Sequence, residues 1–204
     1  VVINKKTTKK NIIKFDEEMY DLDFFEGCEY YSNKIKIYYS SMATPLLTYD
    51  YKLKEQKKRI IKKQKIPSGH NKKNYNLDRV YAISHDGEKI PISIIKRKDT
   101  PKNAPTLLYG YGSYGISISP SFSVSRLSLI DRGMVYAIAH IRGGMEKGKK
   151  WYEDGKKKNK LNSFKDFITC AEFLKKENIS ENITIHGGSA GGLLIGASIN
   201  ISPG

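Results

Sequence analysis

The sequence predicts an α/β fold, in which a mostly parallel sheet carries helices on both faces and antiparallel strands precede it. Three observations lead to this prediction. Residues 1–67 contain short apolar runs about every ten residues, a spacing typical of antiparallel strands. From Pro105 onward, strand-like apolar runs alternate with amphipathic helical segments, as in a parallel sheet. A Gly-x-Ser-x-Gly turn at residues 187–191 lies between the last of these strands and a helix-compatible segment.

The first 67 residues are expected to form antiparallel strands, as in one blade of a β-propeller. Charged or turn-forming residues separate the apolar and aromatic runs, which are Ile12–Phe15, Leu22–Phe25, Ile35–Tyr39, Leu46–Tyr51 and Arg59–Ile61. The tyrosines in these runs fit strand packing better than a binding platform. One blade cannot bury both of its faces, so the segment implies neighbouring blades. The turn residues at 67–69 mark a boundary that divides the chain into residues 1–67 and 68–204.

The second part is expected to begin with a β-hairpin and to continue with alternating strands and helices. Asp86-Gly87 is a typical hairpin turn between Asp78–Ser84 and Lys89–Ile95, and His85 beside it is expected to be a solvated loop residue. The predicted strands that follow are Thr106–Tyr109, Met134–Ile141 and Ile183–Ile185. The predicted helices are Val124–Asp131 and Ser163–Lys176, and the second is capped by Asn162 or Ser163 with Asp166 in a capping box.

Composition narrows the classes of function. The chain has 36 basic and 21 acidic residues, a net charge of +15, which would suit a polyanion partner. The lysines are scattered, however, and neither stacked aromatics nor a zinc signature accompanies them, so a nucleic-acid partner is disfavoured. Cys28 and Cys170 form neither a disulfide framework nor a metal-ligand spacing, which suits a reducing compartment. No apolar run is long enough to span a bilayer, so no membrane partner is expected.

Ser189, at the centre of the Gly-x-Ser-x-Gly turn, is the candidate nucleophile. A tight turn between strand and helix places such a serine at a strained backbone position with its hydroxyl exposed. Gly187 and Gly191 flank it, where side chains would collide with the strand and the helix. The alternative is a plain glycine-rich turn capped by serine, and the flanking strand and helix favour the nucleophile. In such an elbow the backbone N–H of the next residue, Ala190, points into an oxyanion site.

The glycine-rich loop over Tyr109–Gly115 is the candidate for a second oxyanion donor. It directly follows the predicted strand Thr106–Tyr109, its glycines let the backbone approach the site, and it offers tyrosine hydroxyls as donors. The alternative is a Gly/Tyr surface turn, which the presence of the elbow disfavours.

Four motifs, LLYGYGSYG, FSVSRLSLIDRGMVYAIAHIRGG, WYEDG and ITIHGGSAGG, follow one another at the order and spacing of the prolyl oligopeptidase family of serine peptidases. The chain resembles that family over roughly residues 33–204, and the oligopeptidase B (protease II) branch most closely, because YYSSMATP is similar to the last propeller strands of that branch. The resemblance implies a β-propeller joined to an α/β-hydrolase domain that cleaves short peptides in the cytoplasm without a cofactor or metal.

Transferred to this chain, the resemblance divides it into two parts. Residues 1–67 correspond to the end of the propeller, and residues 68–204 to the N-terminal half of the α/β-hydrolase domain. Ser189 corresponds to the nucleophile, the Tyr111 hydroxyl to one oxyanion donor and the Ala190 N–H to the other.

The chain departs from the family pattern at several positions. Ser119 and Ser121 replace the two acidic residues of dibasic-preferring members, so attraction for a basic residue at the second subsite should weaken. Met145 interrupts the glycine run after IRGG. Residues 190–204 contain no Asp, Glu or His, whereas this fold orders its triad as serine, acid, histidine.

The chain is therefore expected to be an internal fragment that lacks the triad Asp and His and is inactive alone. Its expected partners are short peptides and a missing C-terminal half. All four histidines precede Ser189, and His186 is expected to be a packing residue on the incoming strand rather than a substitute base. An α/β-hydrolase esterase is an alternative, disfavoured by YGYG in place of a lipase-like HGG. A basic nucleic-acid-binding module is a second alternative, and it depends on charge alone.

Overall fold

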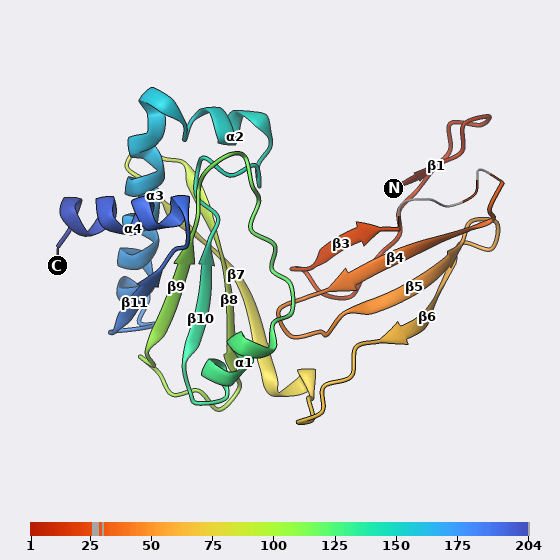
Figure 1. Cartoon of the computed structure of the whole chain (residues 1–204), viewed down its shortest axis with the longest axis horizontal. Coiled ribbons are helices and arrows are strands. Elements are labelled where there is room, and N and C mark those ends of the chain that lie inside the picture. Colours follow the sequence, from red (N-terminus) through yellow and green to blue (C-terminus); the bar gives the residue numbers. More distant parts are fainter. Residues whose placement is uncertain (26–28, 30, 204) are drawn as a thin grey trace.

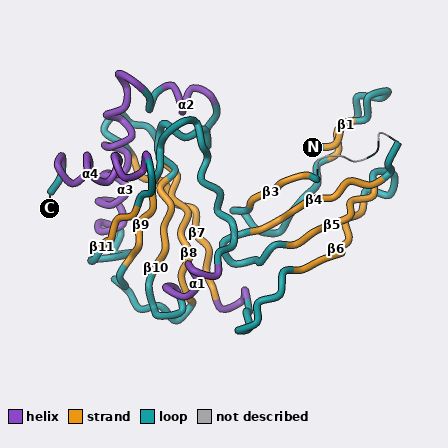
Figure 2. Tube along the Cα trace, viewed as in Figure 1, coloured by secondary structure: helices purple, strands orange, loops and turns teal. Residues whose placement is uncertain are grey.

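The computed structural model describes residues 1–25, 29 and 31–203, and it contains two larger sheets. Figure 1 shows a four-stranded sheet from the first part of the chain on one side, and a five-stranded sheet with helices on the other. The same division is visible in Figure 2, where almost all helical segments accompany the five-stranded sheet. A short pair, β1 (Val2–Ile3) and β2 (Lys10–Asn11), precedes both sheets. Among the described residues, no helix has the length and apolar character needed to cross a membrane.

The four-stranded sheet is an antiparallel meander with the strand order β3-β4-β5-β6. Its strands are β3 (Asp21–Phe24), β4 (Lys34–Ser40), β5 (Leu47–Lys52) and β6 (Lys57–Lys63). Four of the five predicted strand positions in this part are therefore confirmed. Packing of the tyrosines is confirmed as well, because Tyr39 and Tyr51 are buried and the Tyr39 ring meets the Tyr49 ring edge to face.

The prediction of a strand over Ile12–Phe15 is wrong. These four residues have no strand conformation, and the short β2 ends before them. The Phe15 ring instead stacks on Tyr39, with ring centroids 4.9 Å apart, and the Lys58 ammonium lies 4.3 Å from the centroid of the Phe15 ring. The segment thus covers the sheet with side chains and adds no backbone pairing, a distinction that an apolar run alone does not make.

The five-stranded sheet has the order β11-β9-β10-β8-β7 and is mixed, not mostly parallel as predicted. Its strands are β7 (Tyr75–Ile83), β8 (Lys89–Arg97), β9 (Thr106–Gly110), β10 (Val135–Ala139) and β11 (Ile183–His186). Strand β9 pairs in parallel with β10 and β11, whereas β8 pairs antiparallel with β7 and β10. The β7–β8 hairpin, which turns at Gly87 with φ +86° as predicted, causes the difference by adding two antiparallel strands.

Helices cover both faces of this sheet (Figure 1). The helices are α1 (Val124–Ile130), α2 (Lys149–Glu153), α3 (Lys160–Lys176) and α4 (Ala190–Ile201), with 3₁₀ turns at Lys72–Asn74 and Lys157–Asn159. Alternate residues of β10 face opposite sides. Ala137 packs in one cluster with Phe167 of α3 and Leu194 of α4, whereas Ile138 packs in another with Leu127 of α1. The sheet core is therefore apolar on both faces.

The prediction for the start of α3 is wrong. The helix begins at Lys160, and Asn159, the residue before it, makes no side-chain cap. Ser163 and Asp166 are both fully buried, and their side chains bond other segments of the chain. Tertiary partners have thus replaced the predicted capping box.

Of the two cysteines, the structure describes Cys170. Cys170 in α3 is a free, buried thiol, and burial raises its pKa well above the ordinary value. Cys28 lies outside the described residues.

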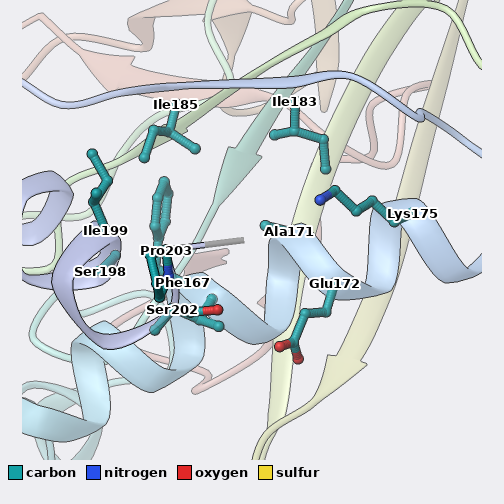
Figure 3. A pocket seen from close by; sticks show the side chains of 11 residues that line it. Phe167, Ala171, Glu172, Lys175, Ile183, Ile185, Ser198, Ile199, Ser202 and Pro203 are labelled. Carbon is teal, nitrogen blue, oxygen red and sulfur yellow. The ribbon is translucent and has the colours of Figure 1, made fainter.

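An apolar pocket of about 210 Å³ opens between α3, α4 and the edge strand β11 (Figure 3). Ile183 and Ile185 of β11 and Ile199 of α4 contribute apolar side chains to its lining. Because β11 is the outermost strand, one side of its backbone has no strand partner among the described residues. Leu193 and Ile201 add exposed apolar surface on α4.

We expect the isolated chain to have no stable independent fold. The apolar groups of β11 and α4, together with the unpaired strand edge, contact water, which favours association over a stable monomer. Thermal unfolding followed by circular dichroism, combined with size-exclusion chromatography, measures this. A soluble monomer with one sharp cooperative transition would contradict the expectation.

Candidate active site

The turn between β11 and α4 has the strained geometry predicted for a nucleophile elbow. Ser189 immediately precedes the first residue of α4, and its backbone has φ +53° and ψ −121°. A positive φ is uncommon for a residue with a side chain and persists where the surrounding structure imposes it. The Ser189 side chain is exposed. The strained turn is thus confirmed, while the role of Ser189 as nucleophile stays a prediction.

Both glycines of the motif lie where a side chain would have little room, and Gly187 is the more crowded of the two. A Cβ on Gly187 would lie 2.4 Å from the Gly191 carbonyl oxygen, and a Cβ on Gly191 would lie 3.0 Å from the Gly110 carbonyl oxygen. A Cβ on Gly188, by contrast, would meet no atom within 4 Å, so this glycine fills no crowded gap. The Gly191–Gly110 approach brings the elbow against the loop that follows β9.

Tyr111 lies beside this elbow. Its Cδ2 atom would be 3.6 Å from a Cβ on Gly191. Strands β9 and β11 pair in parallel, so the segments that follow them emerge at the same edge of the sheet. Ala190 is the first residue of α4, where backbone N–H groups lack intrahelical acceptors and negative charge is favoured. The structure therefore brings Ser189, Ala190 and Tyr111 together, and their catalytic roles remain predictions.

The loop that carries Tyr111 is held by two contacts that the sequence analysis missed. Gly143 of the IRGG motif has φ +95°, and a Cβ there would lie 2.0 Å from the Gly112 carbonyl oxygen. The Gly115 N–H donates to the Gly143 carbonyl at 3.0 Å. From α3, the Lys160 ammonium donates to the same Gly112 carbonyl. The IRGG motif was a usable signal for the first contact, but no pattern signalled Lys160.

Arg142, also in the IRGG motif, is a buried cation held by two carboxylates. Its guanidinium donates to Asp166 through Nε at 2.8 Å and through Nη2 at 2.6 Å, and to Asp86 through Nη1. Burial lowers the pKa of Arg142, but the hydrogen bonds to Asp166 and Asp86 outweigh it and raise the pKa above its usual value. The Arg142 hydrogen bond likewise lowers the pKa of Asp86. This charged cluster ties the segment after β10 to α3 and to the turn of the β7–β8 hairpin.

Within the described residues, no hydrogen bond joins any histidine to Ser189. His140 is buried and its Nε2 lies 2.7 Å from Ser93 Oγ, while burial lowers its pKa. His85 is exposed, as predicted. His186 contacts the Tyr109 ring, with ring centroids 5.4 Å apart, but its side chain is exposed, so it packs less fully than expected.

Comparison with known proteins shows which family this chain resembles. Residues 120–203 match the family model described as the prolyl oligopeptidase family. The chain is 43% identical over 204 residues to Dipeptidyl aminopeptidase BI of Pseudoxanthomonas mexicana and 36% identical over 194 residues to Protease 2 of Moraxella lacunata. These matches include 98% and 93% of this chain, respectively, but the chain spans only 28% of the length of each relative.

The solved structures agree with the sequence comparison. Oligopeptidase B from Leishmania major superposes with a TM-score of 0.91 at 37% identity, covering 98% of this chain and 30% of that one. Sequence and structural similarity thus extend over nearly the whole of this chain. The chain is thus similar to members of the prolyl oligopeptidase family over nearly its whole length, and its residues 120–203 match the model of that family.

Proposed function

We propose that this chain is the nucleophile-bearing part of a cytoplasmic serine peptidase that cleaves short peptides. The strained backbone of Ser189, at φ +53° between β11 and α4, is the observation that carries the proposal. The names of the relatives, a dipeptidyl aminopeptidase and a protease, support peptide substrates. The free thiol of Cys170 fits a reducing compartment.

We assign the two sheets to two domains. Residues 1–67 form the end of a β-propeller, because β3–β6 is a four-stranded antiparallel meander like a propeller blade. Residues 68–204 form the N-terminal half of an α/β-hydrolase domain, because a strand–elbow–helix unit ends a sheet covered by helices on both faces. The proposed boundary falls between β6, which ends at Lys63, and β7, which begins at Tyr75.

In the proposed mechanism, Ser189 Oγ attacks the carbonyl carbon of the scissile peptide bond while a base takes the hydroxyl proton. The carbonyl oxygen becomes negative in the tetrahedral intermediate, where the Ala190 N–H and the Tyr111 hydroxyl donate to it. The intermediate collapses, the C–N bond breaks, and the amine leaves with the proton from the base. Water then hydrolyses the acyl ester and regenerates the Ser189 hydroxyl.

The base and its orienting acid come from a second polypeptide segment in this proposal. Residues 190–204 contain no Asp, Glu or His, so the chain itself offers neither group after Ser189. We propose that a C-terminal half supplies both and docks at the open edge of β11. The unpaired strand edge and the apolar pocket in Figure 3, lined by Ile183 and Ile185, provide the surface for it.

A chimera tests the proposed function. This chain replaces the matching residues of Dipeptidyl aminopeptidase BI, to which it is 43% identical, so that the relative supplies the remaining parts. We expect the chimera to cleave the chromogenic peptide substrates of its parent enzyme. Tyr111→Phe should lower kcat about 10²–10³-fold, because it removes one oxyanion donor.

Two variants serve as controls. Ser189→Ala should abolish turnover. Tyr114→Phe removes a hydroxyl from the same loop, but Tyr114 is 73% exposed, so kcat should not change. A folded chimera without activity would contradict the peptidase proposal, whereas an unchanged kcat in Tyr111→Phe would contradict only the donor role of Tyr111.

A further inference from the structure

Lys160 is at a position that local energetics disfavour. It is the first residue of the 17-residue helix α3, whose first turn holds no acidic residue. The helix dipole places partial positive charge at this end, which opposes an ammonium group. The side chain is half-buried, and burial lowers the pKa of its amine, with no carboxylate among the described residues offsetting this effect. A residue that breaks local rules in this way indicates a tertiary role.

The neighbours of the Lys160 ammonium show what that role is. Its Nζ lies 2.5 Å from the Gly112 carbonyl oxygen, 2.9 Å from Ser113 Oγ and 3.4 Å from Ser163 Oγ. Three neutral oxygens thus surround an ammonium that has three N–H donors. Two of these oxygens belong to the loop that carries Tyr111. The Gly143 backbone also approaches the Gly112 carbonyl oxygen closely, since a Cβ on Gly143 would lie 2.0 Å from it.

The conformation of this loop needs support from outside. Gly112, Tyr114 and Gly115 all have positive φ, at +63°, +58° and +67°. Gly112 and Gly115 adopt a positive φ without strain, but Tyr114 has a side chain and keeps its positive φ only where surrounding groups hold it. Gly112 directly follows Tyr111, so fixing its carbonyl fixes the backbone that sets the direction of the Tyr111 side chain.

We propose that Lys160 is a positioning residue for the oxyanion site. By binding the Gly112 carbonyl and the Ser113 hydroxyl, it anchors the loop on α3 and keeps the Tyr111 hydroxyl in register with Ser189. This inference depends on the proposed function, in which Tyr111 donates to the oxyanion. An oxyanion donor acts only when aligned with the transition state, so a small displacement lowers the rate without weakening substrate binding.

The first test is Lys160→Met in the chimera described above. Methionine keeps an unbranched stem and removes all three donors. We expect kcat to fall about 10–100-fold while KM stays nearly constant, because the lost alignment matters only in the transition state. Lys160→Arg, which keeps the charge and donors, should recover part of the rate. Lys158→Met, which changes an exposed lysine two residues earlier, is the matched control and should leave kcat unchanged.

The second test is a double-mutant cycle that separates positioning from general structural support. If Lys160 acts through Tyr111, Lys160→Met should cost little in a Tyr111→Phe background. A merely structural role would lower the rate by the product of the two single effects. If Lys160→Met does not fold, Ser113→Ala replaces it as the test. This variant removes one acceptor of the Lys160 ammonium and should lower kcat by a smaller factor.

The outcomes distinguish this inference from the function on which it depends. A chimera that folds but is inactive contradicts the peptidase proposal and this inference with it. An unchanged kcat in Tyr111→Phe contradicts the donor role of Tyr111. If Tyr111→Phe lowers kcat but a folded Lys160→Met has normal kcat, the Lys160 inference alone is overturned. It is also overturned if the double variant loses kcat by the product of the two single effects. If only Ser113→Ala can be measured, an unchanged kcat overturns it.

Discussion

The isolated chain of 204 residues is expected to show no labelling of Ser189 by a fluorophosphonate and no cleavage of Arg- or Lys-ended chromogenic peptides. A serine hydroxyl is a poor nucleophile near neutral pH until an adjacent base takes its proton. Where a triad acts as a unit, loss of the base alone can cost about 10⁶ in kcat. No Asp, Glu or His follows Ser189 in this chain, and no histidine of the described part bonds to it.

Mass spectrometry of the purified chain after exposure to the probe measures this directly. The Ser189→Ala variant reports any labelling at other sites, and the active chimera is the positive control for the reagent. Stoichiometric modification confined to Ser189 would contradict the expectation and would mean that the chain contains its own base. His186 would then be tested first, because it is exposed and precedes the serine by three residues.

Asp166→Ala is expected to destabilise the protein by about 3–5 kcal/mol, the range for removing one partner of a buried ion pair. Asp166 is 0% exposed and Arg142 is 2% exposed. Their contact is bidentate, with Nε and Nη2 of Arg142 donating to the two carboxylate oxygens. Without Asp166, the guanidinium remains buried with much of its charge uncompensated, and the Ser84 hydroxyl loses its acceptor at 2.7 Å as well.

Asp86→Ala is the matched control for this prediction, because it removes the other carboxylate from the same guanidinium. Asp86 is 38% exposed, and its loss leaves the Asp166–Arg142 pair intact, so we expect less than about 1 kcal/mol. The free energies of unfolding of both variants are compared by urea unfolding in the chimera, using the transition at which activity is lost. If both variants lose the same free energy of unfolding, burial does not govern the strength of these two ion pairs.

Much of the local structure was predictable from sequence because it depends on near neighbours along the chain. The hairpin at Gly87 and the elbow at Ser189 each place the residue types that a tight backbone turn requires within a few positions. The apolar rhythm of β3 to β6 was equally readable. The prediction of a strand over Ile12–Phe15 was wrong because an apolar run indicates only that side chains are buried. Side chains can be buried by ring packing, as Phe15 partly is, without backbone pairing in a sheet.

The errors in the second part have a shared cause, which is contact between distant segments. The sheet is mixed because the β7–β8 hairpin joins β10, a pairing that no local pattern specifies. The helix α3 begins before its predicted cap because Ser163 bonds the Arg142 carbonyl and Asp166 bonds the Arg142 guanidinium. The two side chains that fit a capping box in the sequence bind Arg142 in the structure instead.

The sequence by itself determined the strand–elbow–helix unit, Ser189 as the candidate nucleophile and the glycine-rich loop as its neighbour, since the spacing of small residues limits how the backbone turns. Only the tertiary structure decided which remote groups support that unit. Arg142 and Asp166 lie 24 residues apart in the chain, and Lys160 and Gly112 lie 48 apart. Such pairs meet because the parallel alignment of β9 and β10 brings the segments after both strands to one edge of the sheet, and α3 packs across it.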